Sequence, residues 1–219
     1  MRRNSQSMLS GGGVSHYQLS VATFNKLARQ YQDKYMLMPL YEPTYQRLSE
    51  MMGARDKVLE LACGPGNIAR YLLARHPQLD YLGTDLAPQM VSLARKNNPT
   101  ARFEVMDCLA IDALPEDFDV LVCGFCLPYL NLAEAQALIE AMARRLKPGG
   151  LLYLSTMEGD YQASHLQTSS SGDQAFVYYH CGEWLNKCLH VAGFDLVNCH
   201  RQDYAERGDV DLFIMSRRR

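Results

Sequence analysis

The most informative segment of this chain is Val58-Leu59-Glu60-Leu61-Ala62-Cys63-Gly64-Pro65-Gly66-Asn67. Its apolar first half predicts a buried strand, and its two glycines predict a tight turn that leads into a helix from Ile68. Because glycine has no side chain, a ligand can lie against the backbone N–H groups of such a turn and against the helix N-terminus. A turn that binds no ligand explains the glycines alone equally well, since short glycine motifs are common.

Glu60 lies in the first predicted strand, and two more carboxylates follow later apolar runs. Together they favour a ligand-binding turn over a turn that binds no ligand. Asp85 ends the run Tyr81-Leu82-Gly83-Thr84, where a carboxylate can accept both hydroxyl groups of a ribose. Asp107 follows a third run and is suited to accept the exocyclic amine of adenine. Each carboxylate also suits a helix cap or a turn. Three strand ends that each carry a polar group suited to one nucleoside are much less expected by chance than one.

The pattern of apolar residues alternates between strands and helices along most of the chain. Strands are predicted at 57–61, 81–84, 102–106, 119–123 and 151–156, and helices at 68–75, 88–97 and 132–146. This alternation favours a parallel sheet with helices on both faces. Two helices are predicted before it, at 16–36 and from Pro39 to Met52. A helix at 182–192 and a hairpin of 194–199 with 210–216 follow it.

Composition narrows the class of protein. A net charge of −2 gives no long-range attraction for a polyanion, so neither nucleic acid nor a membrane surface is indicated as a partner. No apolar stretch approaches the ~20 residues that span a bilayer. Seven cysteines, an odd number, favour reduced thiols, and we expect a cytoplasmic protein. We expect residues 1–15 to be a disordered tail and residues 16–219 to form one domain.

These residues together resemble a class I S-adenosylmethionine-dependent methyltransferase over roughly residues 20–216. The resemblance lies in the glycine turn, in Asp85, in Met106-Asp107-Cys108, and in Leu146-Lys147-Pro148-Gly149-Gly150 before the fifth strand. It implies a Rossmann-like, doubly wound, seven-stranded, mostly parallel α/β sheet with a C-terminal antiparallel hairpin and extra N-terminal helices. Ala62 departs from the pattern, which has glycine there. The alanine methyl is small, so the backbone stays accessible if φ is negative there, and the departure concerns fine contacts more than cofactor binding.

The resemblance also implies a cofactor and its binding residues. The cofactor is S-adenosyl-L-methionine, the product is S-adenosyl-L-homocysteine, and no metal is implied. Tyr31, on the helix that covers the cofactor in similar small-molecule enzymes, would close the methionine end or simply pack between helices. The implied cofactor contacts are Tyr31, Glu60, Ala62, Gly64, Gly66, Asp85, Leu86, Met90, Asp107, Cys108 and Cys123.

The methyl acceptor is expected above the carboxyl ends of the strands, beside the long connection 157–181. His180 is the first candidate for a general base because imidazole titrates near neutral pH, although a helix-capping role is the commoner one for such a histidine. Tyr129 is expected to face the same space. The expected acceptor is a small molecule. Protein or RNA modification, and a cofactor-binding accessory protein without acceptor chemistry, remain alternatives.

A nicotinamide-binding Rossmann domain is the main competitor, because residues 64–69 satisfy its glycine pattern. Glu60 close to the turn, the Lys-Pro-Gly-Gly turn and the terminal hairpin favour the methyltransferase instead. Nothing in the chain predicts a second domain for a hydride acceptor.

Overall fold

The computed structural model describes residues 15–219 apart from 116, 170 and 205–207. The expected tail, residues 1–15, therefore lies outside the described residues except for Ser15. This serine caps the first helix, because its hydroxyl accepts a hydrogen bond from the backbone N–H of Gln18. None of the helices in the described part of the chain combines the length and the apolar character needed to cross a bilayer.

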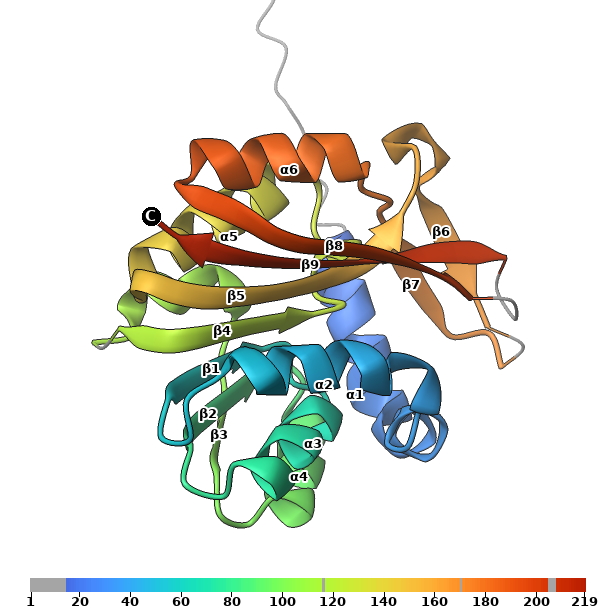
Figure 1. Cartoon of the computed structure of the whole chain (residues 1–219). Helices are drawn as coiled ribbons and strands as arrows, with labels where there is room; N and C mark the ends of the chain where they lie inside the picture. Colours follow the sequence, from blue (N-terminus) through green and yellow to red (C-terminus); the bar gives the residue numbers. More distant parts are fainter. Residues whose placement is uncertain (1–14, 116, 170, 205–207) are drawn as a thin grey trace, which may run out of the picture.

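Seven strands form one sheet in the order β3-β2-β1-β4-β5-β9-β8 (Figure 1). The first five in this order are parallel, whereas β9 runs antiparallel to both β5 and β8. This confirms the predicted Rossmann-like sheet with its C-terminal hairpin. The strands are β1 (Lys57–Leu61), β2 (Asp80–Asp85), β3 (Arg102–Val105), β4 (Phe118–Gly124), β5 (Leu146–Glu158), β8 (Phe194–Tyr204) and β9 (Asp209–Arg218).

Helices cover both faces of the sheet, as the apolar character of its central strands requires. One core packs β1 residues such as Val58 against α2, α3 and α4, and the other packs Leu59 and Leu61 against α5, α6 and η2. The alternation of β1 residues between the two cores is the period-2 pattern of a strand. These helices are α2 (Glu42–Met51), α3 (Asn67–Arg75), α4 (Pro88–Asn97), α5 (Leu132–Arg145), α6 (Gly182–Val191) and the 3₁₀ helix η2 (Cys108–Ala113).

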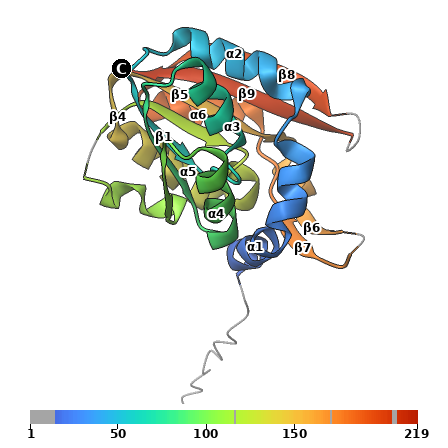
Figure 2. The ribbon, with the colours of Figure 1, turned by 90° about the horizontal axis from the view of Figure 1, so that it is seen from below.

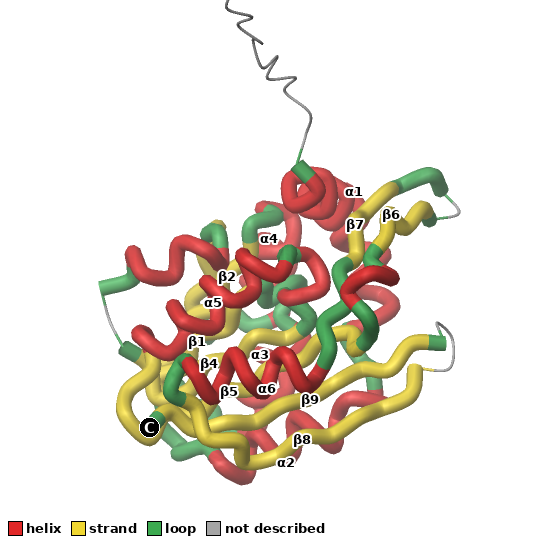
Figure 3. The backbone as a smooth tube through the Cα atoms, turned by 90° about the horizontal axis from the view of Figure 1, so that it is seen from above, coloured by secondary structure: helices red, strands yellow, loops and turns green. Residues whose placement is uncertain are grey.

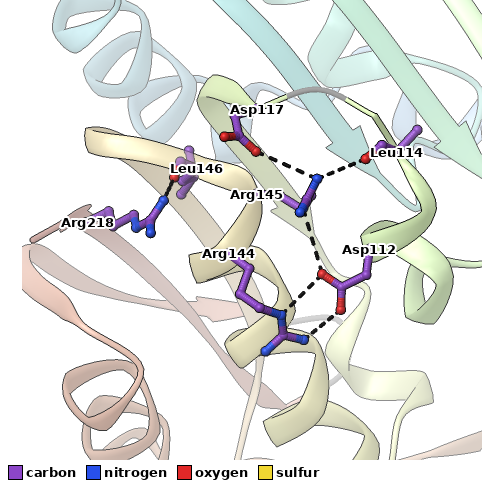
Figure 4. A network of polar contacts seen from close by, with 7 residues as sticks. All are labelled: Asp112, Leu114, Asp117, Arg144, Arg145, Leu146 and Arg218. Carbon is purple, nitrogen blue, oxygen red and sulfur yellow. Dashed lines mark hydrogen bonds and ion pairs between the residues drawn. The ribbon is translucent and has the colours of Figure 1, made fainter.

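Helix α5 is fixed at both of its ends. At the start, Asn131 accepts hydrogen bonds from two backbone N–H groups while Glu134 accepts one from the backbone of Asn131. At the end, Arg144 donates two hydrogen bonds to Asp112 of η2 and Arg145 donates to the carbonyl of Leu114 (Figure 4). In the same figure Arg218 of β9 donates to the carbonyl of Leu146 at the start of β5. The exposed Arg144–Asp112 ion pair contributes little alone. Together with the Arg145 bond to Leu114 it links α5 to η2.

Two additions lie beside the carboxyl ends of the strands. Helix α1 (His16–Tyr35) leads through the short helix η1 (Pro39–Tyr41) into α2. The connection after β5 forms a hairpin of β6 (His165–Thr168) and β7 (Gln174–Val177). The sequence predicted a long connection at 157–181, and this hairpin within it was not predicted. Figures 2 and 3 both place α1 next to this hairpin.

Candidate active site

Two adjoining cavities lie at the carboxyl ends of β1, β2 and β4. The larger measures about 690 Å³ and the smaller about 400 Å³, both including their open mouths. The two cavities share five lining residues, Tyr31, Ala62, Gly64, Gly124 and Phe125. A single elongated ligand can therefore extend from one cavity into the other.

The turn after β1 approaches both cavities with its backbone. Gly64 and Gly66 have φ values of 53° and 81°, in the left-handed region that glycine adopts without strain. Ala62 has φ of 51°, so the condition of a negative φ at this position is not met. A left-handed conformation costs a residue with a Cβ roughly 1 kcal/mol.

Asp85 connects the turn to the end of β2. Its two carboxylate oxygens accept hydrogen bonds from the backbone N–H groups of Gly64, at 2.9 Å, and Ala87, at 2.8 Å. Burial raises the pKa of this carboxyl group, and the two N–H donors oppose that rise. Since each oxygen of a carboxylate accepts more than one hydrogen bond, Asp85 keeps acceptor capacity toward the larger cavity, which it lines.

Glu60 is the second acidic group of the site and lines the smaller cavity. Its side chain is buried, at 2% exposure, and it accepts a hydrogen bond of 2.8 Å from the hydroxyl of Tyr81. Burial raises the pKa of Glu60 to about 8, while the Tyr81 bond acts in the opposite direction. At neutral pH this carboxyl group is therefore mostly protonated.

Helix α1 lies over the larger cavity and is attached on both sides. The Tyr17 hydroxyl donates to Asp107 at 2.7 Å, beside the adenine end expected from the sequence. On the other side, Lys26 pairs with Asp173 at 2.6 Å, and the His16 ring stacks on Phe176 with centroids 4.0 Å apart. The helix therefore links the nucleotide side of the sheet to the β6–β7 hairpin.

Most of the predicted cofactor residues meet at these cavities, and three do not line either of them. Gly66 is the N-cap residue of α3, Asp107 caps η2 by accepting from the backbone of Leu109, and Cys123 is fully buried in β4. The residues that do line a cavity are Tyr31, Glu60, Ala62, Gly64, Asp85, Leu86, Met90 and Cys108.

The two candidates for a catalytic role occupy different environments. Tyr129 lines the larger cavity, with its ring 4.8 Å from that of Phe24. His180 lines neither cavity and has 0% exposure. Its Nε2 lies 2.9 Å from the carbonyl oxygen of Leu127, its ring stacks on Trp184, and burial lowers its pKa. Nor does its side chain cap α6, whose first N–H is bound by Glu158.

The sequence of this site matches a known family. Residues 58–150 match the family described as "Methyltransferase domain". A trans-aconitate 2-methyltransferase of Methylobacterium nodulans is 32% identical over 57% of this chain and 48% of its own length. A demethylmenaquinone methyltransferase of Deinococcus radiodurans is 36% identical over 45% of this chain and 42% of its own length. The class I S-adenosylmethionine-dependent methyltransferases are therefore the family that this chain resembles. The chain spans about half the length of the curated relatives it matches.

Solved methyltransferases share the fold over nearly the whole chain. The 1,6-didemethyltoxoflavin-N1-methyltransferase of Burkholderia thailandensis superimposes with a TM-score of 0.72 at 18% identity, covering 96% of this chain and 93% of that one. The magnesium protoporphyrin IX methyltransferase of Synechocystis PCC 6803 gives 0.73 at 15% identity, covering 96% and 100%. At these identities the likeness concerns the fold.

Sequence reasoning missed one wall of this candidate site. Beyond Tyr31, helix α1 contributes Tyr17, Ser20, Val21 and Phe24 to the larger cavity. The helix itself was predicted at 16–36, but helical spacing does not distinguish side chains that face a cavity from those that face a core. Phe125 was also missed, and it has φ of 50° at the end of β4. Among the described residues, no group of three or more His, Cys, Asp or Glu side chains is placed to hold a metal.

Proposed function

We propose that this chain is an S-adenosylmethionine-dependent methyltransferase that acts on a small molecule. The observation that carries the proposal is the convergence of the Gly64 turn, Asp85 and Glu60 on two joined cavities under helix α1. The chemistry differs along the site. Asp85, at one end, can accept hydrogen bonds from a ribose diol, and Glu60, at the other end, is a buried carboxyl group. This order suits a nucleoside joined to an amino acid.

The nucleoside half of the cofactor fits the larger cavity. Asp85 is placed to accept the ribose hydroxyls with the acceptor capacity that Gly64 and Ala87 leave. Leu86 and Met90, which line this cavity, would contact the base together with Cys108. Asp107 does not line the cavity. It would hold Tyr17 in the cavity wall through their hydrogen bond, or accept the adenine amine if Tyr17 moves aside.

The amino-acid half fits the smaller cavity. A ligand ammonium near Glu60 would favour the ionised carboxylate and lower its raised pKa. Gly64 admits close approach of a ligand to its backbone, because it has no side chain and adopts φ of 53°. Tyr31 lines both cavities and would close this end of the site.

The chain itself supplies alignment and exclusion of water. When bound, the cofactor supplies an activated methyl group, so the protein needs mainly to position the acceptor in line with it. Helix α1 would exclude solvent from the reacting atoms because it is attached on both of its sides. A general base is required only for an acceptor that is protonated at working pH. Tyr129 is the cavity-lining candidate for that role.

Calorimetric titration with S-adenosylmethionine, S-adenosylhomocysteine and NADH tests the proposal. Micromolar binding of the first two and no binding of NADH would support it. Binding of NADH, or of none of the three, would contradict it.

Asp85→Ala should weaken S-adenosylmethionine binding by at least ~1.5 kcal/mol, as expected for losing hydrogen bonds to a charged group. The matched control is Asp80→Ala, which removes an exposed carboxylate from the other end of the same strand. The control should bind normally. Unchanged affinity in a folded Asp85→Ala protein would refute the role of Asp85.

The catalytic candidates are separated by a second pair of variants. Tyr129→Phe keeps the ring and removes the hydroxyl, and it should slow methyl transfer without changing cofactor affinity if Tyr129 acts as a base. His180→Asn should lower stability because it alters a buried, hydrogen-bonded side chain. A folded His180→Asn protein with a reduced turnover number and a shifted pH profile would indicate that His180 takes part in catalysis.

The identity of the acceptor class is part of the same proposal. Relatives named for trans-aconitate and demethylmenaquinone support a small molecule, and the charge of −2 supports neither nucleic acid nor a membrane surface as partner. We place the protein in the cytoplasm because its seven cysteines, an odd number, favour reduced thiols. Cofactor turnover with small molecules, total protein and total RNA distinguishes the alternatives. Tight cofactor binding without turnover on any of them would favour an accessory protein.

A further inference from the structure

The walls that the two cavities offer to a second ligand carry no basic side chain. Among the described lining residues there is no lysine, arginine or histidine, and the acidic ones are Glu60 and Asp85. Lys26, a basic side chain on α1, is exposed and paired with Asp173, away from the lining. An acceptor that carries carboxylates would therefore lose its hydration without gaining a charged partner, which is costly.

The same walls are rich in aromatic rings where the cavities meet. Phe125, at the end of β4, lines both cavities and lies 5.3 Å from the ring of Tyr41. Phe24 of α1 lies 4.8 Å from Tyr129 and 5.8 Å from Tyr31, in edge-to-face arrangements. These five rings come from α1, η1, η3 (Leu127–Tyr129) and the end of β4. Tyr31 and Phe125 line both cavities, Phe24 and Tyr129 line the larger one, and Tyr41 lines the smaller one. The transferable methyl group would lie where the two cavities meet.

Neither acid of the site is free to pair with a cationic acceptor. Both oxygens of Asp85 bind backbone N–H groups, and Asp85 is assigned to the ribose. Glu60 lies in the smaller cavity with a pKa of about 8, and it is assigned to the amino-acid end. Apart from these two acids, no described residue of the lining is an aspartate, glutamate, lysine, arginine or histidine.

We propose that the methyl acceptor is an uncharged, planar aromatic molecule held against Phe125, Phe24 and Tyr129. This rests on the proposed function, and it narrows the acceptor to one chemical class. The curated relatives named for trans-aconitate therefore do not indicate the acceptor of this chain. In the reaction, the bond from methyl carbon to sulfur breaks, with its electron pair left on sulfur. A lone pair of an acceptor oxygen or nitrogen forms the new bond, and the proton of that atom passes through Tyr129, the cavity-lining candidate base, to bulk solvent.

Two matched probes test the charge requirement: 3,4-dihydroxybenzamide, which is neutral, and 3,4-dihydroxybenzoate, which is an anion with the same ring. Each is titrated into the full chain saturated with S-adenosylhomocysteine, and each is incubated with S-adenosylmethionine and analysed by mass spectrometry. We expect the amide to bind about tenfold more tightly and to be methylated faster. Equal or tighter binding of the benzoate, methylation of trans-aconitate, or no binding of the amide at millimolar concentration would overturn the inference.

Variants test where the acceptor lies. Phe125→Leu should weaken binding of the amide at least threefold, whereas Tyr71→Leu, an aromatic residue outside both cavities, should not. Val21→Lys places a cation in the lining and should bring the affinities of the two probes within about threefold of each other. An unchanged preference in Val21→Lys, with cofactor binding intact, would contradict the assigned place. Failure of S-adenosylhomocysteine to bind the wild-type chain would instead refute the proposed function.

Discussion

Replacing Glu60 by glutamine should change how the stability of this protein depends on pH. Glutamine keeps the shape of the side chain and its capacity to accept from the Tyr81 hydroxyl, but it does not titrate. In the folded protein burial raises the pKa of Glu60 to about 8, against an ordinary value of 4.5. Between these two pH values the folded state binds a proton that the unfolded chain has released.

The sign follows from that difference in bound protons. Stability falls as pH rises wherever the folded state binds more protons than the unfolded state. The contribution of Glu60 is therefore fully present below pH 4.5 and is lost as pH rises to about 8. At about 1.36 kcal/mol per pH unit, the full difference corresponds to about 5 kcal/mol as an upper limit. Relaxation around the charge reduces the observed effect, and we expect at least about 2 kcal/mol.

Urea unfolding at several pH values between 5 and 9 measures this effect. The free energy of unfolding of the wild type, minus that of Glu60→Gln, should decrease steadily across the range. Glu104→Gln, which changes an exposed glutamate on β3, is the control and should give a constant difference. A constant difference for Glu60→Gln would refute the raised pKa. S-adenosylhomocysteine should reduce the slope for the wild type, because its ammonium group would favour the ionised carboxylate.

Two backbone predictions follow from the turn. Gly66→Ala should cost at least about 2 kcal/mol in urea unfolding, because the new Cβ would lie 2.4 Å from Nδ2 of Asn98 and φ is 81°. Gly149→Ala is the control, because Gly149 has φ of 76° and open space around it, and it should cost only about 1 kcal/mol. Equal losses of stability in the two variants would show that the clash with Asn98 does not contribute. Ala62→Gly should raise stability by about 0.5–1 kcal/mol and keep cofactor affinity, since φ is 51°. A loss of stability in Ala62→Gly would mean that the alanine is not strained.

The arrangement of strands and helices could be predicted from the sequence because local patterns and chain order determine it. The Asn131–Glu134 capping box and Pro88 in the first turn of α4 were both visible as residue types at fixed offsets, and both are present. Alternation of strands and helices requires a parallel sheet, so the expected sheet followed without knowledge of any contact.

The lining contributed by α1 could not be predicted in the same way. Tyr17 and Phe24 have the spacing of core residues, and a cavity wall and a core both favour apolar side chains. Whether such a stripe meets a sheet or a ligand depends on where the helix docks. Here that is decided by partners far away in sequence, Asp107 for Tyr17 and Asp173 for Lys26. Residue spacing within α1 contains no information about them.

Backbone strain also could not be predicted from the sequence, and the strained residues lie at the centre of the site. Ala62 and Phe125 are the non-glycine residues with positive φ in the described part of the chain. They follow the neighbouring strands β1 and β4, in which Leu61 pairs with Cys123, and both line both cavities. Strain of this kind persists where the surrounding structure determines the conformation, and it concentrates at functional sites. In this chain the two strained residues lie where the two cavities meet, which is the place that we assign to the methyl group.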